Sequence, residues 1–237
     1  MITISLEDLT SLEEKVHITL ERYSSLRPKE RQVAWNLSQR LKEHHLFTYV
    51  DSLNVALTTR GIMKAAIELR IPEIKGITEF LPRTGLYGGL LHDIGKLETP
   101  LEILDKTYGI GIEEHGSYSL EDHEEMKKHP EAGREILRRH GLLMSAWIAL
   151  LHHPEYPPRS EIPSYPKEFS QETIKHLEFA TKAVSLADQY IAYHRPNKMH
   201  GNRPLNPRQI KQKLTEGNLD YADLIDKLYK NHVFVLV

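Results

Sequence analysis

Apolar residues recur at steps of three and four along most of this 237-residue chain, which is the spacing of amphipathic helices. Near the N-terminus, for example, Leu9, Leu12 and Val16 would share one helix face. A β-like apolar run occurs only at residues 233–237, and it could equally be a frayed tail. We therefore predict an all-α fold, a helical bundle. The predicted helices span residues 5–23, 31–44, 51–69, 85–96, 120–128, 130–141, 142–152, 173–194, 207–214 and 221–229.

The chain is long enough, and at 40% hydrophobic residues apolar enough, to bury a sizeable core. We predict an N-terminal helical extension at residues 1–45 and a main helical domain at residues 46–237. Residues 154–171 contain five prolines and are expected to form an ordered loop or lid.

The first eight residues lack a basic start followed by an apolar core, so no signal peptide is expected. The longest near-apolar run, residues 142–151, has about half the length of a membrane span. The formal net charge of −2 provides no global basic field for binding nucleic acid. We expect a cytoplasmic protein that binds neither membranes nor nucleic acids. A homodimer is compatible with these observations.

The chain has no cysteine, which excludes disulfides, thiolate metal sites and cysteine nucleophiles, and this composition fits a reducing compartment. A metal would have to be held by His, Asp or Glu, and these ligands suit Fe, Mn, Zn or Mg. Histidine is abundant, with 14 residues, and four of them fall where metal chemistry could use them. These four are His92, His129, His152 and His153.

The adjacent pair His92 and Asp93 ends an apolar stretch, and Lys96 follows. If this stretch is helical, His92 and Lys96 lie one turn apart on one face, with Asp93 about 100° around the axis. A metal at the helix end could then be held by the pair, with Lys96 directed at a bound anion.

Three further elements carry candidate ligands. His129 precedes a proline and is expected at a helix start, and the tandem His152-His153 is expected at a helix end. Asp188 borders an apolar stripe, where a carboxylate is costly unless it is paired or metal-bound. Four imidazoles and two carboxylates exceed what one structural zinc needs, and they suit two metals that share a bridging carboxylate and a bridging hydroxide.

Each feature has an ordinary explanation by itself. A His-Asp dipeptide is common, and Lys96 alone would be a solvated charge at a helix C-terminus. Asp188 alone could cap a helix or pair with an arginine. Their occurrence together, each at a helix end or an apolar edge, favours a metal site.

The motifs in this order resemble the HD-domain metal-dependent phosphohydrolase superfamily, and most closely its HD-GYP branch. The resemblance covers roughly residues 51–198. It rests on His92-Asp93-Ile94-Gly95-Lys96, Thr99-Pro100, His129-Pro130, His152-His153, Leu186-Ala187-Asp188 and Arg195-Pro196.

The resemblance implies a role for each matched position. Six residues correspond to metal ligands, and Asp93 among them corresponds to the metal bridge and, with Lys96, to the catalytic residues. Lys96 corresponds to the lysine that contacts the phosphate or the nucleophilic water. Arg195 and Lys198 correspond to a basic pair that, together with Lys96, binds substrate phosphate. The six implied ligands are His92, Asp93, His129, His152, His153 and Asp188.

The sequence departs from the family pattern at the first helix and after the tandem histidines. The family usually has a His where this chain has Asp51, which could supply a carboxylate ligand instead. The Gly-Tyr-Pro element is degenerate, and its nearest match is Ser164-Tyr165-Pro166. An acidic residue expected shortly after Asp188 is Ile191 here. These changes affect the number of metals and the choice of substrate.

The resemblance implies a phosphodiesterase that acts on a cyclic dinucleotide, such as cyclic di-GMP, or on a related nucleotide through a metal-bridging hydroxide. Two divalent metal ions are expected, Fe or Mn, with Zn, Ni or Mg as alternatives. A second hypothesis is a catalytically degenerate HD module that binds a nucleotide or a partner protein for regulation. A third is an HD nuclease or nucleotidase.

Overall fold

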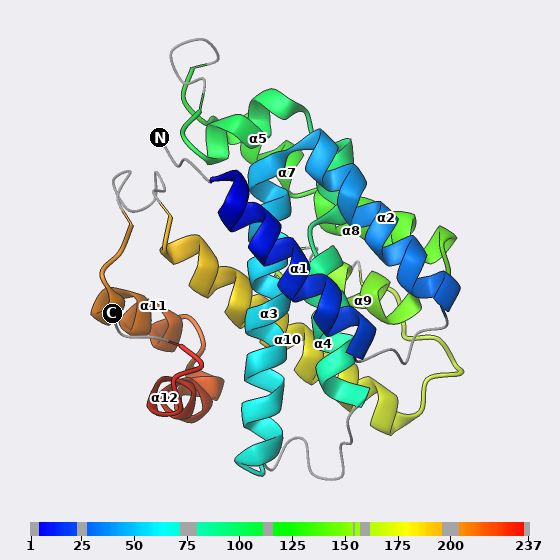
Figure 1. Ribbon diagram of the computed structural model, residues 1–237, viewed down its shortest axis with the longest axis vertical. Coiled ribbons are helices and arrows are strands. Elements are labelled where there is room, and N and C mark those ends of the chain that lie inside the picture. The colour runs from blue at the N-terminus through cyan, green and yellow to red at the C-terminus, as the bar shows by residue number, and fades with distance from the viewer. Residues whose placement is uncertain are drawn as a thin grey trace.

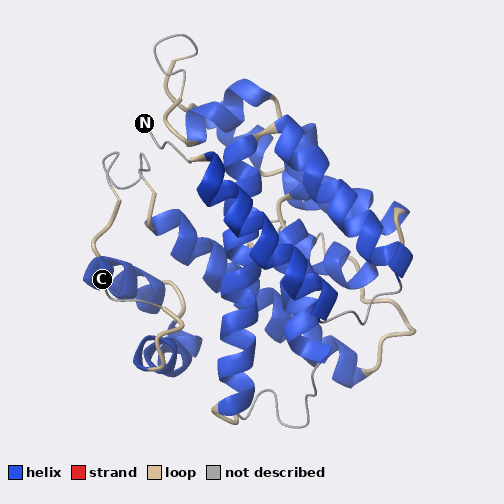
Figure 2. Ribbon diagram, in the orientation of Figure 1, coloured by secondary structure: helices blue, strands red, loops and turns tan. Residues whose placement is uncertain are grey.

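The computed structural model describes residues 5–22, 28–71, 80–110, 116–153, 155–156, 162–195 and 204–234. All regular structure within these residues is helical, so the predicted all-α fold is confirmed (Figure 2). The elements in chain order are α1 (Leu6–Arg22), α2 (Pro28–His44), α3 (Leu46–Glu68), α4 (Phe80–Leu91), η2 (Ile94–Glu98), α5 (Leu101–Thr107), α7 (Leu120–Met126), α8 (His129–Arg139), α9 (Leu143–Leu151), α10 (Gln171–Tyr193), α11 (Pro207–Glu216), η5 (Leu219–Tyr221) and α12 (Ala222–Lys230).

The two longest helices, α3 and α10, pack against each other at the centre of the molecule (Figure 1). Helix α3 is apolar on several sides because α1, α2, α4 and α10 all pack on it. Its N-terminus is capped by His45, whose Nδ1 accepts a hydrogen bond from the backbone N–H of Thr48 at 3.2 Å.

Helix α4 approaches its neighbours closely through glycines. A Cβ added to Gly89 would lie 2.8 Å from the Cα of Ala56 on α3, and one added to Gly88 would lie 2.5 Å from Cδ1 of Ile148 on α9. This close packing buries the C-terminal end of α4 among α3, α9 and α10. The residues that follow α4 therefore enter the centre of the bundle.

Helices α1 and α2 share one of the buried apolar clusters with α3, α4 and α9. Leu9, Val16 and Leu41 belong to one buried cluster with Leu86 and Leu90 of α4. In Figure 1 the two helices lie across the front of the bundle, whereas α11 and α12 form a pair beside the end of α10. The predicted division at residues 45 and 46 coincides with the junction of α2 and α3, and its standing as a domain boundary stays a prediction.

The predicted helix over residues 85–96 is wrong beyond Leu91. The chain turns at His92 and Asp93, where Asp93 has φ −98° and ψ 11°, and continues as the 3₁₀ helix η2. The reason is a close backbone contact between η2 and α8. A Cβ on Gly95 would lie 1.9 Å from the backbone oxygen of His129, so this position accepts no side chain without rearrangement.

Other differences from the predicted elements are small, such as the starts of α2, α3 and α4, which come three to five residues earlier than predicted. Helix α5 was not predicted, and it begins directly after Pro100. Of the β-like run at the C-terminus, residues 235–237 lie outside the described residues, and Phe234 is buried without forming a strand. Among the described helices, none combines the length and the apolar character needed to cross a bilayer.

Candidate metal centre

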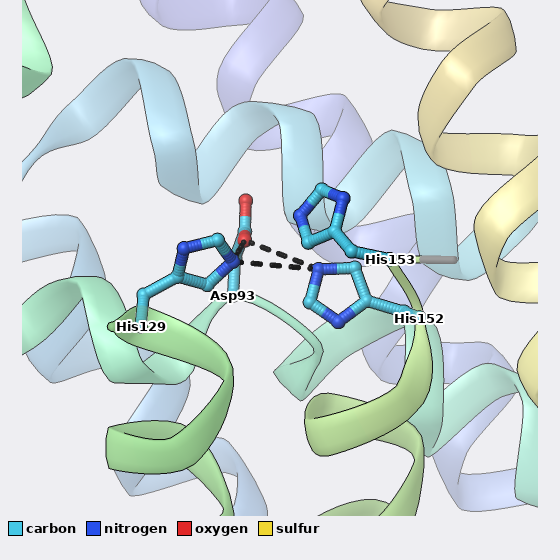
Figure 3. A group of neighbouring side chains, drawn as sticks. All are labelled: Asp93, His129, His152 and His153. Atoms are coloured by element: carbon cyan, nitrogen blue, oxygen red, sulfur yellow. Dashed lines mark hydrogen bonds and ion pairs between the residues drawn. The ribbon is translucent and has the colours of Figure 1, made fainter. Parts of the chain in front are cut away.

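Four elements bring the predicted ligands to one place at the centre of the bundle. The turn after α4 carries His92 and Asp93, the first residue of α8 is His129, and α10 carries Asp188. The tandem histidines His152 and His153 follow the last residue of α9. Two groups of ligand atoms result, each lying within 4.8 Å of one another. The first group is Asp93, His129, His152 and His153 (Figure 3), and the second is His92, His152 and Asp188.

Three of the histidines are oriented by the same local contact. The Nδ1 of each ring donates to the backbone carbonyl three residues earlier: His92 to Gly89 at 2.7 Å, His129 to Met126 at 2.6 Å, and His152 to Ala149 at 2.8 Å. This contact leaves Nε2 of each ring directed at the centre, where a neutral ring offers its lone pair to a metal.

The distances among the inward-facing atoms suit a shared cation. The Oδ1 of Asp93 lies 3.1 Å from Nε2 of His129 and 3.8 Å from Nε2 of His152, and the two Nε2 atoms are 3.5 Å apart. Nitrogen and oxygen ligands about 2.0–2.2 Å from one ion lie about 2.8–3.6 Å from each other. The first group therefore needs only small shifts to hold a metal.

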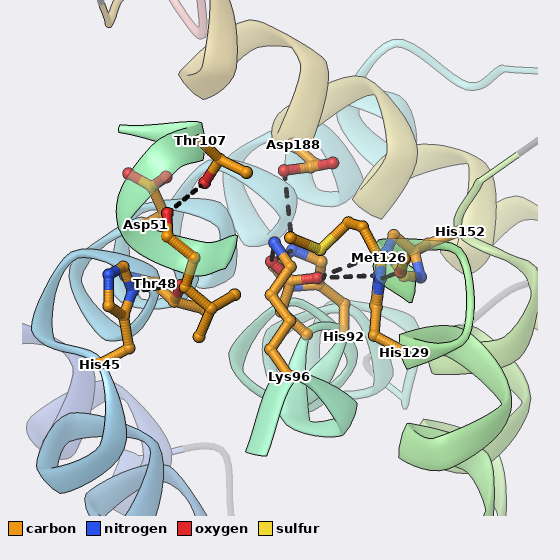
Figure 4. A network of polar contacts seen from close by, with 12 residues as sticks. His45, Thr48, Asp51, His92, Lys96, Thr107, Met126, His129, His152 and Asp188 are labelled. Atoms are coloured by element: carbon orange, nitrogen blue, oxygen red, sulfur yellow. Dashed lines mark hydrogen bonds and ion pairs between the residues drawn. The ribbon is translucent and has the colours of Figure 1, made fainter. Parts of the chain in front are cut away.

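The two oxygens of Asp93 face the two different groups. Oδ1 faces His129 and His152, whereas Oδ2 lies 3.4 Å from Nε2 of His92, which is 3.6 Å from Oδ1 of Asp188. Figure 4 shows Asp188 above His92 and Lys96 beside them. A carboxylate in this position can bridge two cations.

Two buried polar atoms without hydrogen-bond partners among the described residues lie at the same centre. Nε2 of His92 and Oδ1 of Asp93 are both buried, and neither has a hydrogen-bond partner in the part of the chain that the structure describes. Such orphaned groups are costly in a protein interior. Divalent metal ions that take mixed nitrogen and oxygen ligands would satisfy both atoms, so the residues present fit this kind of cofactor.

The electrostatics of the centre differ from one histidine to the next. Burial alone would lower the pKa of His92, but Asp93 and Asp188 outweigh it and raise the pKa to about 10. Burial likewise opposes ionisation of Asp93, yet Lys96 and His92 hold its pKa well below the usual range. Burial lowers the pKa of His153 to about 3 and that of His152 well below its usual value. These two rings are therefore neutral near pH 7, the form that binds metal.

Lys96 lies close to the ligands although the chain there is not an α-helix. Its Nζ donates to Oδ2 of Asp93 at 2.6 Å, and only 13% of its side chain is exposed. The lysine is thus held at the edge of the centre through Asp93 rather than by lying one helical turn from His92.

Asp51 is not brought into either ligand group among the described residues. Its Oδ2 accepts a hydrogen bond from the Tyr108 hydroxyl at 2.7 Å and lies 2.8 Å from Nη1 of Arg195. Figure 4 shows Asp51 on the opposite side of Lys96 from His129 and His152. Of the predicted basic pair, Arg195 is placed in this contact, and Lys198 lies outside the described residues.

Two aromatic residues at the centre were not predicted. The ring of Tyr156 stacks on His153 with centroids 4.5 Å apart and an interplanar angle of 21°. Tyr108 lies under the guanidinium of Arg195, 4.3 Å from its ring centroid. The only signal for Tyr156 is its place three residues after the tandem histidines, and no sequence pattern marks Tyr108.

The fold is a helical bundle, and its centre holds two overlapping groups of imidazole and carboxylate ligands. These two features together are typical of a helical domain that holds metal ions. A family model described as HD domain matches residues 48–212, which is more than half of the chain. The chain belongs to the HD-domain family, as its motifs predicted.

One curated relative adds information about this family. It is a protein of Thermotoga maritima named cyclic di-GMP phosphodiesterase, and it is 29% identical to this chain over 168 residues. The match covers 69% of this chain and 39% of the relative, so the chain spans well under half of the length of that protein.

Proposed function

We propose that this protein is a metal-dependent phosphodiesterase that hydrolyses a cyclic dinucleotide such as cyclic di-GMP. The observation that carries the proposal is the position of Asp93, whose Oδ1 faces His129 while its Oδ2 lies 3.4 Å from His92, a member of a second ligand group that overlaps the first at His152. This arrangement supports two metal ions with a shared carboxylate. The membership of the HD-domain family and the name of the Thermotoga relative support the reaction and the substrate class.

The ligands would be His129, His152, His153 and one oxygen of Asp93 for one ion. His92, Asp188 and the other oxygen would hold the second. Divalent ions of the Fe or Mn type supply two things when bound: they lower the pKa of a coordinated water and they neutralise charge on a phosphoryl group.

The protein's own residues position the substrate and exclude water. Lys96, held at 2.6 Å from Asp93, would donate a hydrogen bond to a non-bridging phosphate oxygen, and its positive charge would stabilise the charge that develops there. The low exposure of His92, Asp93 and His152 keeps this region of the site in a low-dielectric environment, which strengthens such interactions.

The proposal can be tested by assaying a substrate panel with Mn or Fe(II) added. The panel contains cyclic dinucleotides, linear dinucleotides, mononucleotides and single-stranded DNA and RNA. We expect turnover of a cyclic dinucleotide, bound metal in the purified protein, and loss of both in Asp93→Asn. A matched control is His140→Ala, which removes an exposed histidine whose Nδ1 also bonds a carbonyl of its own helix.

The alternative functions give different results in the same panel. Cleavage of single strands with no effect on cyclic dinucleotides would replace the proposal with a nuclease. Metal binding without turnover of any phosphate ester would support a regulatory module instead. Full activity in Asp93→Asn would show that the site is elsewhere.

A further inference from the structure

Asp51, Tyr108 and Arg195 form a compact polar triad beside the candidate metal centre. They come from three elements: Asp51 from α3, Tyr108 from the C-terminal end of α5, and Arg195 from the end of α10. The carboxylate binds both partners at 2.7 and 2.8 Å, and the guanidinium lies over the tyrosine ring. Each residue therefore contacts the other two.

The triad holds the guanidinium in one place. The ion pair with Asp51 fixes one edge, and the Tyr108 ring supports one face by a cation–π contact. Tyr108 itself packs against His45 and Phe47, with ring centroids 5.2 and 5.5 Å away. Arginine in such surroundings loses little further side-chain freedom when it binds a ligand.

The guanidinium keeps donors for a further partner. Arginine has five N–H groups, and the contact with Asp51 involves Nη1. Nε is buried and has no hydrogen-bond partner in the described ranges. Arg195 lies two residues beyond the last residue of α10, and the nearby carboxylates of Asp188 and Asp93 help to raise the pKa of its guanidinium. The free donors are thus next to the centre that would hold a phosphate.

The same contacts occupy Asp51. One of its oxygens already has two partners, and the residue is absent from both groups of ligand atoms. A carboxylate bound to a guanidinium and a hydroxyl at these distances has its charge compensated without a metal.

We propose that Asp51 and Tyr108 are positioning residues for Arg195, the residue to which the family resemblance gives phosphate binding, and that Asp51 binds no metal. The inference deepens the proposed function and rests on it for the identity of the substrate. The anion bound is a phosphate oxygen of the nucleotide, for which the planar fork of donors is well suited.

The test is steady-state kinetics with cyclic di-GMP on the Mn-loaded protein, combined with metal analysis. Asp51→Asn should raise KM about tenfold, the loss expected when one charge-assisted contact that orients Arg195 is removed. The kcat value and the metal content should stay near those of the wild type. Tyr108→Phe keeps the ring and removes the hydroxyl, so it should raise KM by a smaller factor.

A double-mutant cycle gives the sharpest readout. Because Asp51 acts through the guanidinium, Asp51→Asn should add nothing to KM in an Arg195→Ala background. Asp226→Asn is the matched control, since it removes a carboxylate from the Lys211 ion pair, 2.6 Å long, on α11 and α12. Tyr49→Phe is the control for Tyr108, because its hydroxyl also donates to a carboxylate at 2.7 Å.

Several results would overturn the inference. Loss of bound metal in Asp51→Asn would make this residue a ligand. An unchanged KM, or a KM effect that persists without Arg195, would remove the positioning role. If the wild type turns over no phosphate ester, the proposed function fails. The role of the triad is then tested by measuring the binding of inorganic phosphate to the metal-loaded protein. Tenfold weaker phosphate binding in Asp51→Asn supports the triad's role, and equal binding refutes it.

Discussion

The position of Lys96 is explained by its contact with Asp93 at the centre and not by local secondary structure. It follows a turn rather than continuing a helix, yet its ammonium group is held on Asp93 in a largely buried place. A lysine side chain is buried in this way when its charge is paired with an acidic group or binds a ligand. At this centre both are available, because Asp93 pairs with the ammonium and a phosphate would complete its hydrogen bonds.

We expect Lys96→Gln to lower kcat about 100-fold, the magnitude found when a single donor to developing charge is removed. Metal content should change little, since no metal ligand is altered. The measurement is kcat with saturating cyclic di-GMP and metal analysis of the same sample. Lys127→Gln is the control, because it removes another lysine that pairs with a carboxylate three residues earlier, Glu124. Equal kcat values in both variants would exclude a catalytic role for Lys96.

The candidate ligands could be predicted from the sequence because their chemistry is local. Histidine and aspartate next to helix ends, in a chain without cysteine, limit the residues that can hold a metal. The partners of Asp51 could not be predicted, since Tyr108 is 57 residues away and only the packed bundle brings it near. The stacking of Tyr156 on His153 likewise depends on the path of a loop.

Among the elements, the helices were predictable from periodicity and the turn at the centre was not. The apolar spacing that predicts a helix over residues 85–96 continues through Ile94, which is indeed buried. The helix nevertheless ends at Leu91, because the backbone of η2 meets the backbone of α8 at Gly95. A tertiary contact of this kind overrides local propensity and leaves no periodic signal.

The contact at Gly95 leads to a prediction about stability. Gly95→Ala would place a methyl group 1.9 Å from the His129 oxygen and 2.4 Å from the Gly133 nitrogen, and both are backbone atoms that cannot rotate away. We expect a loss of about 3 kcal/mol in the free energy of unfolding, measured by urea denaturation, and weaker metal binding. Gly61→Ala is the control, because its nearest neighbour is a side-chain methyl of Val233 at 3.3 Å. Equal stability of the two variants would contradict the close contact.

The cap of α3 leads to a prediction about pH. Burial, partly opposed by Asp105, lowers the pKa of His45 to about 4 in the folded protein, below the ordinary value of 6.5. Between these two values the unfolded chain takes up a proton and the folded chain does not, so stability falls as the pH falls from 6.5 to 4. At higher pH this histidine contributes no pH dependence.

His45→Asn should reduce this dependence, because asparagine is also a good N-cap and does not titrate. The check is the thermal unfolding midpoint of the metal-free protein at intervals from pH 7.5 to pH 4. The variant should lose less than the wild type over the acid range and match it closely near neutral pH. Parallel pH curves for the two proteins would rule out His45 as the titrating group.

On the scale of the whole molecule, the N-terminal helices are part of the core. Five large apolar residues of α1 and α2 are buried in one cluster with residues of α3, α4 and α9. Each such side chain contributes about 1.5–3 kcal/mol when buried, whereas a whole domain is stable by about 5–15 kcal/mol. The five are Leu9, Val16, Leu20, Leu37 and Leu41.

A chain that begins at residue 46 should therefore be unstable. We expect it to aggregate or to unfold without a cooperative transition, because the faces of α3 and α4 that α1 and α2 cover would be exposed. Size-exclusion chromatography and thermal unfolding of the shortened chain give the answer. A monomer that unfolds cooperatively and still binds metal would instead support residues 1–45 as a separable extension.

The three histidines whose Nδ1 atoms donate to backbone carbonyls also reveal a feature of the electrostatic field inside the bundle. Their partner carbonyls, those of Gly89, Met126 and Ala149, lie in the last turns of α4, α7 and α9. Three helices thus present their partially negative C-terminal ends to one point, in addition to Asp93 and Asp188. These helix ends add to the attraction that the two carboxylates exert on a divalent cation at the centre.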